Sequence, residues 1–279
     1  MKVFFNYSLL NSVLKKNQTI GLVPTMGTLH KGHISLIEKA LKENAQIIVS
    51  IFINPTQFGD LSELKKYPKN LDNDLNIIEK ISSKIYVYAP EPKDLYKTSV
   101  SSSSFEFGNI ENIMEGQLKP GHFQGVATII EKLFNNFLPT NAYFGEKDFQ
   151  QLQIIKTLVN QKKILTKIID CPIVREKNGL ALSSRNTLLS IDDKQKASFI
   201  FQQLLRAKLL WKSKNSEKII KEIKQSFLSN SNLKLEYIDI RYEDSLKSAQ
   251  KKSFKKARAF IAAKIENVRL IDNLALDEF

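Results

Sequence analysis

Two of the chain's three histidines lie three residues apart in VPTMGTLHKGH, residues 23–33. His30 and His33 follow an apolar run, TIGLVP, and precede ISLIEKAL, whose apolar residues recur at helical spacing. We therefore expect the pair at a turn from a buried strand into a helix, where free backbone N–H groups and the helix dipole favour an anion. Imidazole donates hydrogen bonds and can carry a proton near neutral pH. The stretch is therefore a candidate site for an anionic ligand.

Two other interpretations of this histidine pair are open from the stretch alone. The two residues can be a chance pair on a solvated turn. They can also be two ligands of a metal site, which would need further ligands from His122, Cys171 or carboxylates.

Polar clusters follow three further strand-like runs: NPTQFG (54–59), GEKDFQQ (145–151) and REKNGLALSSRN (175–186). In a parallel sheet with helices on both faces, ligands bind outside the carboxyl ends of the strands. The clusters therefore indicate one site built from several strand ends. Its candidate residues are His30, His33, Gln57, Lys147, Asp148, Gln151, Ser183, Ser184 and Arg185.

These residue types suit a nucleoside triphosphate and a small acid. Lys147 and Arg185 can neutralise phosphate oxygens, the arginine with two parallel hydrogen bonds. Ser183 and Ser184 add neutral donors, and Asp148 can accept hydrogen bonds from ribose hydroxyls. The two glutamines can hold a carboxylate without neutralising it, so that it stays free to attack. A protein nucleophile is not expected, because the serines adjoin an arginine and no base lies next to them in sequence.

The elements that must position these residues alternate between strand and helix, which predicts an α/β fold with a Rossmann-like doubly wound parallel sheet. After about residue 186 the pattern changes to that of a smaller α+β domain. We expect domains at 1–172 and 173–279, with SSRN near their boundary and the second domain acting as a lid. The expected strands are 2–5, 19–24, 46–53, 84–90, 141–146 and 164–170, then 233–242, 257–266 and 268–276. The expected helices include one beginning near His33 and those at 70–81, 125–137, 192–212 and 215–229.

Composition narrows the class of protein. The 279 residues are 42% hydrophobic and 25% charged, as in an ordinary globular protein. No stretch is apolar enough to span a bilayer or to serve as a signal peptide, and a single cysteine fits a reducing cytoplasm. The net charge of +13 is spread along helical patterns, and its one dense cluster, KKSFKKAR (251–258), is interpreted as a solvated face. TSVSSSS (98–104) is expected to be a surface loop. We expect neither a nucleic acid nor a membrane as partner.

Five blocks of sequence, taken in order, resemble one known family. PTMGTLHKGH, SIFINPTQFG, GHFQGVATII, GEKDFQQL and GLALSSRN are similar to those of the pantothenate synthetase (pantoate–β-alanine ligase) family. HxGH alone resembles the wider group of nucleotidylyl transferases related to class I aminoacyl-tRNA synthetases. The similarity runs from about residue 19 to 190, and the C-terminal third matches in length and layout only.

The resemblance implies a reaction and a role for each matching residue. Pantoate and ATP would give pantoyl adenylate and diphosphate, and β-alanine would then displace AMP to give pantothenate. His33 would be the proton donor, with His30, Lys147 and Arg185 completing the catalytic set. Gln57 and Gln151 would bind pantoate, and Gln57 would lie near β-alanine. The residues implied to contact ATP are Met26, Gly27, Thr28, Leu29, His30, Lys31, Gly32, His33, Gly145, Glu146, Lys147, Asp148, Val174, Leu182, Ser183, Ser184 and Arg185.

Members of this family use Mg²⁺ and are typically homodimers, so both are expected here. Asp74 is the one residue we name as a candidate metal ligand. Four residues depart from the family pattern: Lys69 and Lys119 replace arginines, and Asn73 and Asn178 replace aspartates. Lysine keeps the positive charge but loses the two-pronged contact of a guanidinium.

Two competing functions remain open from sequence. A sister adenylyltransferase with another acceptor would keep HxGH and SSRN but is not expected to carry both glutamines. A nucleic-acid-binding protein would use the basic C-terminal domain and bind in a salt-sensitive way.

Overall fold

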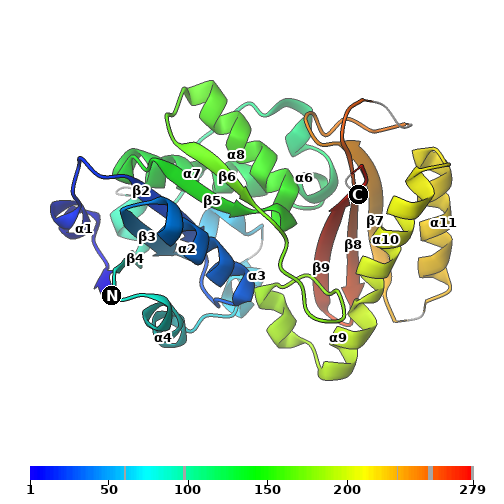
Figure 1. Ribbon diagram of the computed structural model, residues 1–279, viewed down its shortest axis with the longest axis horizontal. Coiled ribbons are helices and arrows are strands. Elements are labelled where there is room, and N and C mark those ends of the chain that lie inside the picture. The colour runs from blue at the N-terminus through cyan, green and yellow to red at the C-terminus, as the bar shows by residue number, and fades with distance from the viewer. Residues whose placement is uncertain (60, 97–98, 231, 251–253, 278–279) are drawn as a thin grey trace. The chain divides into compact units, whose positions relative to one another are not determined.

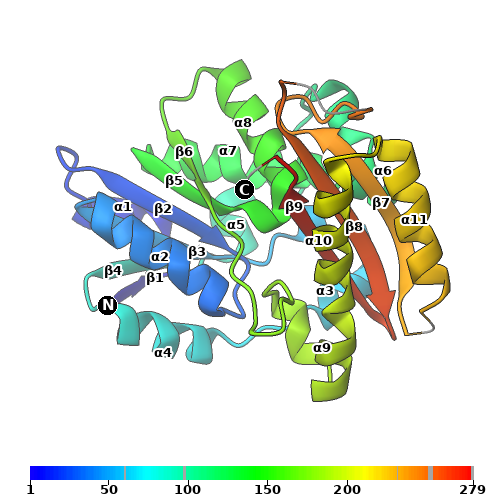
Figure 2. The ribbon, with the colours of Figure 1, turned by 45° about the vertical axis from the view of Figure 1, so that its right-hand side comes forward.

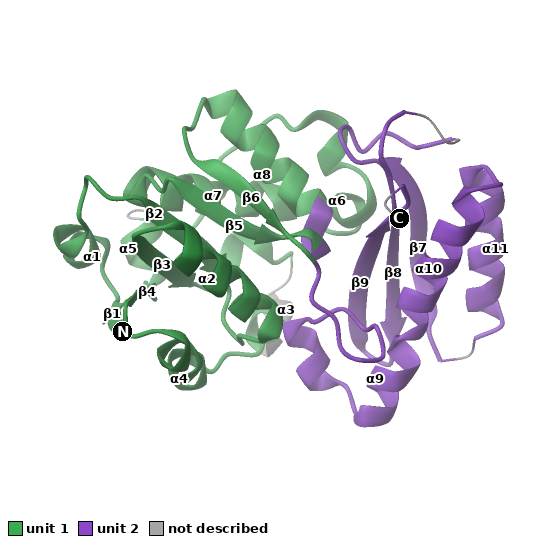
Figure 3. Ribbon diagram, viewed as in Figure 1, with its two compact units in different colours: residues 1–146, 150–172 green, residues 147–149, 173–279 purple. Residues whose placement is uncertain are grey.

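The computed structural model describes residues 1–59, 61–96, 99–230, 232–250 and 254–277 (Figure 1). They divide into two compact units (Figure 3). Unit 1 comprises Met1–Glu146 and Gln150–Pro172, and unit 2 comprises Lys147–Phe149 and Ile173–Phe279. Residues 147–149, placed within the first domain by the sequence, group with the second unit because they contact its strands.

Unit 1 is built on a parallel sheet of six strands in the part of the chain that is described. The strand order is β1-β4-β3-β2-β5-β6, and every pairing is parallel. This confirms the predicted doubly wound sheet. The order reverses between β2 and β5, the place where such sheets bind ligands. The strands are β1 Lys2–Phe4, β2 Ile20–Thr25, β3 Gln46–Ile51, β4 Ile85–Tyr88, β5 Asn141–Gly145 and β6 Lys167–Cys171. The connecting helices are α1 Tyr7–Val13, α2 Lys31–Glu43, η1 Pro55–Gln57, α3 Leu61–Lys66, α4 Leu71–Ile81, α5 Pro92–Tyr96, η2 Gly108–Glu111, α6 Met114–Leu118, α7 His122–Phe137, η3 Glu146–Asp148 and α8 Phe149–Lys162. Of these, Lys147–Phe149, at the end of η3 and the start of α8, belong to unit 2.

The two faces of this sheet are covered by different helices. On one face Val23, Val49 and Val87, from neighbouring strands, share a buried cluster with Ile37 of α2 and Ile78 of α4. Side chains alternate between the faces of a strand, so the intervening residues face the other way. There the ring of Tyr88 in β4 packs edge-on against Phe137 of α7, 5.1 Å between centroids. Burial on both faces explains why these strands are almost wholly apolar.

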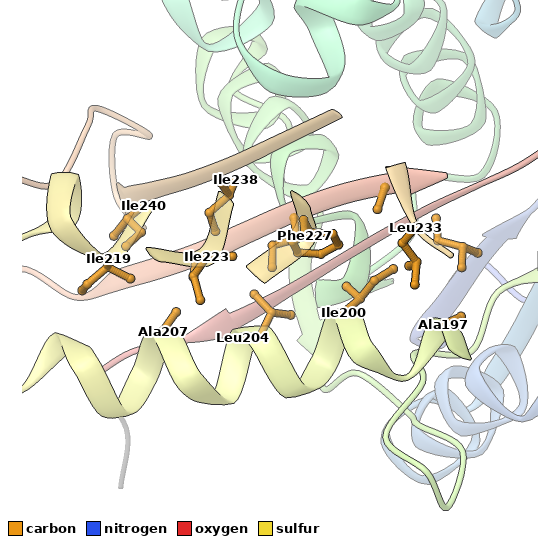
Figure 4. Close-up of a cluster of buried hydrophobic side chains, with 14 of the residues drawn as sticks. Ala197, Ile200, Leu204, Ala207, Ile219, Ile223, Phe227, Leu233, Ile238 and Ile240 are labelled. Atoms are coloured by element: carbon orange, nitrogen blue, oxygen red, sulfur yellow. The ribbon is translucent and has the colours of Figure 1, made fainter. Parts of the chain in front are cut away.

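In the described part of unit 2, three strands form an antiparallel sheet, with α10 and α11 along one face (Figure 2). Figure 4 shows that Leu204 of α10 points toward Ile223 of α11 and Ile200 toward Phe227, within a cluster that also includes Ile240 of β7. The predicted α+β arrangement is confirmed. Its elements are η4 Ser184–Leu188, α9 Ile191–Ala197, α10 Phe199–Trp211, α11 Ser216–Leu228, β7 Lys234–Tyr242, β8 Ala257–Ile265 and β9 Val268–Ala275.

The observed bounds differ from the predicted ones by up to three residues, and two of the differences have a clear structural basis. The run 164–170 was expected to be a strand throughout, but β6 begins only at Lys167, and Leu165 is 99% exposed. The helix expected over 192–212 is two helices that meet at Ser198, whose hydroxyl donates to the carbonyl of Gln195 (2.6 Å). A side-chain hydroxyl bonded to the backbone in this way competes with the helical ladder.

Two polar segments were expected to lie on the surface. Residues 99–104 of the serine-rich run form no helix or strand and are exposed, as predicted; Thr98 lies outside the described residues. Phe254, Lys255 and Lys256 of the basic cluster are exposed, and 251–253 lie outside the described residues. Arg258 is buried at 5% exposure, so the solvated face predicted for 251–258 is wrong at that residue. Within the described chain, no helix is long and apolar enough to cross a membrane.

The single cysteine gives a direct test of the packing of unit 1. Cys171 ends β6 at 3% exposure, and burial raises the pKa of its thiol to about 11. Because the thiolate is the reactive form, we expect iodoacetamide to label the native protein very slowly at pH 8 and rapidly in denaturant. Labelling of the folded protein at the rate of a free thiol would contradict this packing.

Candidate active site

The loop between β2 and α2 is held by a carboxylate from α4. Asp74 is 1% exposed, and its two oxygens accept hydrogen bonds from the backbone N–H groups of Thr28 (2.8 Å) and Leu29 (2.7 Å). Gly27 and Thr28 both have positive φ, 82° and 52°, which turns successive N–H groups toward one acceptor. Burial raises the pKa of Asp74, while the two N–H donors act in the opposite direction. Both carboxylate oxygens serve the loop, so we assign Asp74 an anchoring role, and its role as a metal ligand stays a prediction.

The two histidines complete a reciprocal cap at the start of α2. His30 Nδ1 accepts from the N–H of Gly32 (3.1 Å), and His33 Nδ1 accepts from the N–H of His30 (3.3 Å). Their rings lie 4.1 Å apart between centroids. An Nδ1 that accepts a hydrogen bond cannot carry the proton of a neutral ring, so that proton is on Nε2. Each neutral imidazole can therefore donate through Nε2.

This geometry corrects one expectation. The sequence suggested that free backbone N–H groups at the turn would bind an anion. The N–H groups of Thr28, Leu29, His30 and Gly32 already have protein acceptors. Because these four backbone N–H groups are already bonded, we do not expect them to bind an anion. The imidazole Nε2 groups are the donors that we expect to do so.

Removal of the Asp74 carboxylate tests the anchor. We expect Asp74→Ala to lower the free energy of unfolding by about 2–4 kcal/mol, since each buried N–H left without an acceptor costs about 1–3 kcal/mol and relief of carboxylate desolvation offsets part of the loss. Asp72→Ala is the matched control, because Asp72 is exposed in the same first turn of α4. Urea unfolding measures both. Equal effects of the two substitutions would contradict the anchoring role.

Gln57 follows β3 in a short helical turn fixed by a buried asparagine. Asn54 is fully buried; its Nδ2 donates to the carbonyl of Gly125 in α7 (3.0 Å), and its Oδ1 accepts from the hydroxyl of Tyr96 (2.5 Å). A Cβ on Gly125 would lie only 2.2 Å from the carbonyl oxygen of Thr56, so this position requires glycine. The backbone around Gln57 is thus tightly constrained.

The third histidine also contributes to this turn. His122 Nδ1 lies 2.8 Å from the carbonyl oxygen of Gln57. A carbonyl can only accept, so Nδ1 of His122 carries the proton, the opposite tautomer from His30 and His33. Sequence reasoning missed Asn54, Tyr96 and His122 as supports of Gln57; the Asn-Pro pair at 54–55 indicates a turn, but nothing local points to its distant partners.

The two adjacent glutamines of α8 have different roles in the structure. Gln150 is 4% exposed; its Nε2 donates to the carbonyls of Ile110 and Ile113, both at 2.8 Å, and its Oε1 accepts from the N–H of Glu115 (3.0 Å). It therefore fixes the segment that leads into α6. Gln151 is half-buried and one helical step away, so it remains the candidate for contact with a ligand.

In unit 2, the candidate residues Lys147 and Asp148 form one turn. Lys147 Nζ lies 3.3 Å from Asp148 Oδ1, and their side chains are 17% and 47% exposed. The carbonyl of Lys147 accepts from Asn273 Nδ2 in β9 (2.9 Å). The backbone of this turn is thus attached to the sheet of unit 2.

The other candidates of unit 2 lie in a loop that folds back on itself. The N–H of Leu182 donates to the carbonyl of Val174 (3.0 Å), and Ser183 Oγ accepts from the N–H of Arg185 (3.2 Å) at the start of η4. Asn178, which replaces an aspartate of the family pattern, donates through Nδ2 to the carbonyl of Lys194 (3.1 Å). An aspartate could not make that contact. The departure thus serves the fold of the loop.

The described residues contain no group of three or more His, Cys, Asp and Glu residues that could hold a metal ion. Among the described residues, His30 and His33 therefore have no third His, Cys, Asp or Glu ligand with which to form a metal site. For the same reason, the described residues contain no such cluster of protein ligands for the expected Mg²⁺.

Comparison with known proteins decides the family. The family model for pantoate-β-alanine ligase matches residues 5–275. The chain belongs to the pantoate–β-alanine ligase family. It is 45% identical to the pantothenate synthetase of Christiangramia forsetii, with 99% of this chain and 100% of that protein covered. It is 47% identical to that of Flavobacterium psychrophilum, covering 96% and 95%.

Solved structures agree with this membership of the pantoate–β-alanine ligases. The pantothenate synthetase of Thermus thermophilus has a TM-score of 0.92 at 32% identity, with 99% of each chain covered. The pantoate-β-alanine ligase of Francisella tularensis, solved in complex with β-γ ATP and β-alanine, has a TM-score of 0.82 at 39% identity, covering 100% of this chain and 99% of that one. The predicted family and fold class are both confirmed.

Proposed function

We propose that the residues of both units described above serve one reaction, the ATP-dependent ligation of (R)-pantoate to β-alanine. The reaction is that of the family, which matches nearly the whole chain. In the first step, the carboxylate of pantoate attacks the α-phosphorus of ATP, the bond to the bridging oxygen breaks, and diphosphate leaves. In the second, the amine of β-alanine attacks the acyl carbon, loses a proton, and displaces AMP to leave pantothenate.

The observation that carries this proposal is the pair of imidazoles at the carboxyl end of β2, each with its neutral-ring proton on Nε2. These donors lie at the strand next to the reversal of the sheet order. His33 would donate to the phosphate on which negative charge develops, with His30 beside it. Such preset donors are effective because they need no reorganisation during the reaction.

The remaining residues are assigned as ligands of the substrates. Lys147 and Arg185 would neutralise phosphate oxygens, aided by Ser183 and Ser184, and Asp148 would bind the ribose. Gln57 and Gln151 would hold pantoate, with Gln57 also near β-alanine. The remaining members of the two ATP-contacting segments, residues 26–33 and 145–146, together with Val174 and Leu182, would line the nucleotide.

Mg²⁺ is proposed as a companion of the ATP phosphates. This ion is commonly bound by one or two carboxylates together with substrate phosphates, and the described residues offer it no cluster of such groups. We therefore assign it no protein ligand and no step.

The test is an assay with ATP, D-pantoate and β-alanine, in which AMP and pantothenate should form in equal amounts. A sister adenylyltransferase would instead show exchange of diphosphate into ATP that does not require pantoate. A folded protein that makes no pantothenate would overturn the proposal. Binding of RNA or DNA that weakens as salt rises but persists at physiological salt would favour the nucleic-acid alternative. Weak binding that vanishes at physiological salt would dismiss it.

Three expectations stay predictions: a homodimer, a cytoplasmic location, and movement of residues 173–279 as a lid. Light scattering of the purified protein would test the dimer. Comparison of structures with and without ATP would test the lid.

A further inference from the structure

Strand β9 of unit 2 contains two buried polar neighbours, Asp272 and Asn273, at 5% and 1% exposure. Adjacent residues of a strand point to opposite faces. Asp272 pairs across the sheet with Ile261, which belongs to the apolar cluster under α10 and α11, whereas Asn273 pairs with Phe260 on the other face. The two side chains thus serve opposite sides of one strand.

Asn273 connects the sheet to the Lys147 turn. Its Nδ2 donates to the carbonyl of Lys147 (2.9 Å), and its Oδ1 accepts from Arg258 Nη1 (2.6 Å). Arg258 is 5% exposed, is bonded to Glu243 through Nε (2.8 Å), and stacks 4.2 Å from the ring centroid of Phe149. The amide of Asn273 donates at one end and accepts at the other, which neither aspartate nor leucine can do.

Asp272 connects the same strand to the SSRN-bearing loop. Arg175 donates two parallel hydrogen bonds to its carboxylate, Nη1 to Oδ2 at 2.6 Å and Nη2 to Oδ1 at 2.9 Å. Arg175 Nη1 also donates to the carbonyl of Gly179 (3.0 Å) within that loop. The N–H of Asn273 donates to Asp272 Oδ1 (2.7 Å), which joins the two sets of contacts.

Stability alone does not explain why this set of buried, hydrogen-bonded polar side chains is present. Burial of charged groups is costly, and a well-packed apolar replacement is often as stable. What the polar chain supplies is fixed geometry between two segments far apart in sequence. Both segments carry the residues assigned to the triphosphate.

We propose that Asn273 and Asp272 are positioning residues for ATP: Asn273, held by Arg258, sets the Lys147–Asp148 turn, and Asp272 sets the 174–185 loop through Arg175. This inference rests on the proposed function of those two segments. Misplacement of a catalytic group by about 1 Å can cost about 100-fold in rate. If the two residues position the ATP-binding segments, their substitution should therefore lower the rate with ATP and leave the use of pantoate unchanged.

Asn273→Asp tests the proposal most directly, because aspartate keeps the acceptor for Arg258 but cannot donate to Lys147. We expect kcat/KM for ATP to fall by about 10- to 100-fold, with the KM for pantoate changed by less than about 2-fold. Asn267→Asp is the matched control, since Asn267 is exposed in the turn before β9. Arg175→Lys, which keeps the charge but loses the two-pronged contact, should also weaken ATP use specifically.

A second substitution separates positioning from general weakening. If Asn273 acts through the Lys147 turn, the combined variant Asn273→Asp with Lys147→Ala should lose less than the product of the two single losses. Unchanged ATP kinetics in Asn273→Asp, or fully multiplicative losses, would overturn the inference. The wild type is assayed alongside. If it makes no pantothenate, the proposed function is wrong. If the wild type is active and the variant is unaffected, only the positioning inference is wrong.

Discussion

Replacement of His33 by alanine is expected to lower kcat by about 100- to 1,000-fold, the usual cost of removing one preset donor from a developing negative charge. The geometry supports this role because His33 Nδ1 accepts from the backbone of His30 and leaves the proton on Nε2. The KM for pantoate should change little. The measurement is steady-state formation of AMP, with circular dichroism to confirm the fold.

Two further variants separate the chemistry of His33 from its capping of α2. His33→Asn places an oxygen near the position of Nδ1 and keeps an acceptor for the cap, but it has no donor at the Nε2 position. His33→Gln can place its amide N–H₂ there. We expect the asparagine variant to be as slow as the alanine variant yet more stable, and the glutamine variant to recover part of the rate. Full activity in His33→Asn would show that the ring serves only as a cap.

The parallel sheet was predictable because its strands are buried on both faces and contain almost only apolar residues. Val23, Val49 and Val87 mark three of these strands without ambiguity. β6 was placed less well because it lies at the edge of the sheet. There the apolar Leu165 precedes the strand at 99% exposure, so apolar character no longer reports burial.

The break between α9 and α10 could not be predicted from the sequence for a different reason. Apolar residues at helical spacing continue through Ser198, so the periodicity predicts one helix. At the end of the first helix, both the hydroxyl and the backbone N–H of Ser198 bond to the carbonyl of Gln195. Side-chain competition of this kind leaves no trace in the pattern of apolar residues.

Candidate residues for the chemistry could be proposed from sequence because their types and their places after strands are local properties; their roles stay predictions. Their supports were not, because those contacts are long-range. Asp74 lies 46 residues from Thr28, and Tyr96 lies 42 residues from Asn54. From the sequence, Asp74 was a possible metal ligand, and nothing local indicated that it also anchors the loop at 27–29. Only the fold shows that two backbone N–H groups occupy it.

Lys147→Ala is expected to lower kcat/KM for ATP by at least about 100-fold, since it removes a positive charge assigned to the phosphates. The side chain is only 17% exposed, and its backbone is fixed by Asn273, so neither water nor a neighbouring lysine can readily replace it. Lys93→Ala is the control, because Lys93 forms an exposed pair with Glu91. The Lys93→Ala variant should have the same kcat/KM for ATP as the wild type.

The salt dependence of the Lys147→Ala loss distinguishes a local contact from a general effect of charge. Exposed charges are screened over about 8 Å at physiological ionic strength, whereas shielded pairs are screened much less. The ratio of wild-type to variant activity should therefore stay nearly constant between low and moderate salt. A ratio that falls toward one as salt rises would mean that Lys147 acts on ATP from a distance, as any of the chain's 42 basic residues could.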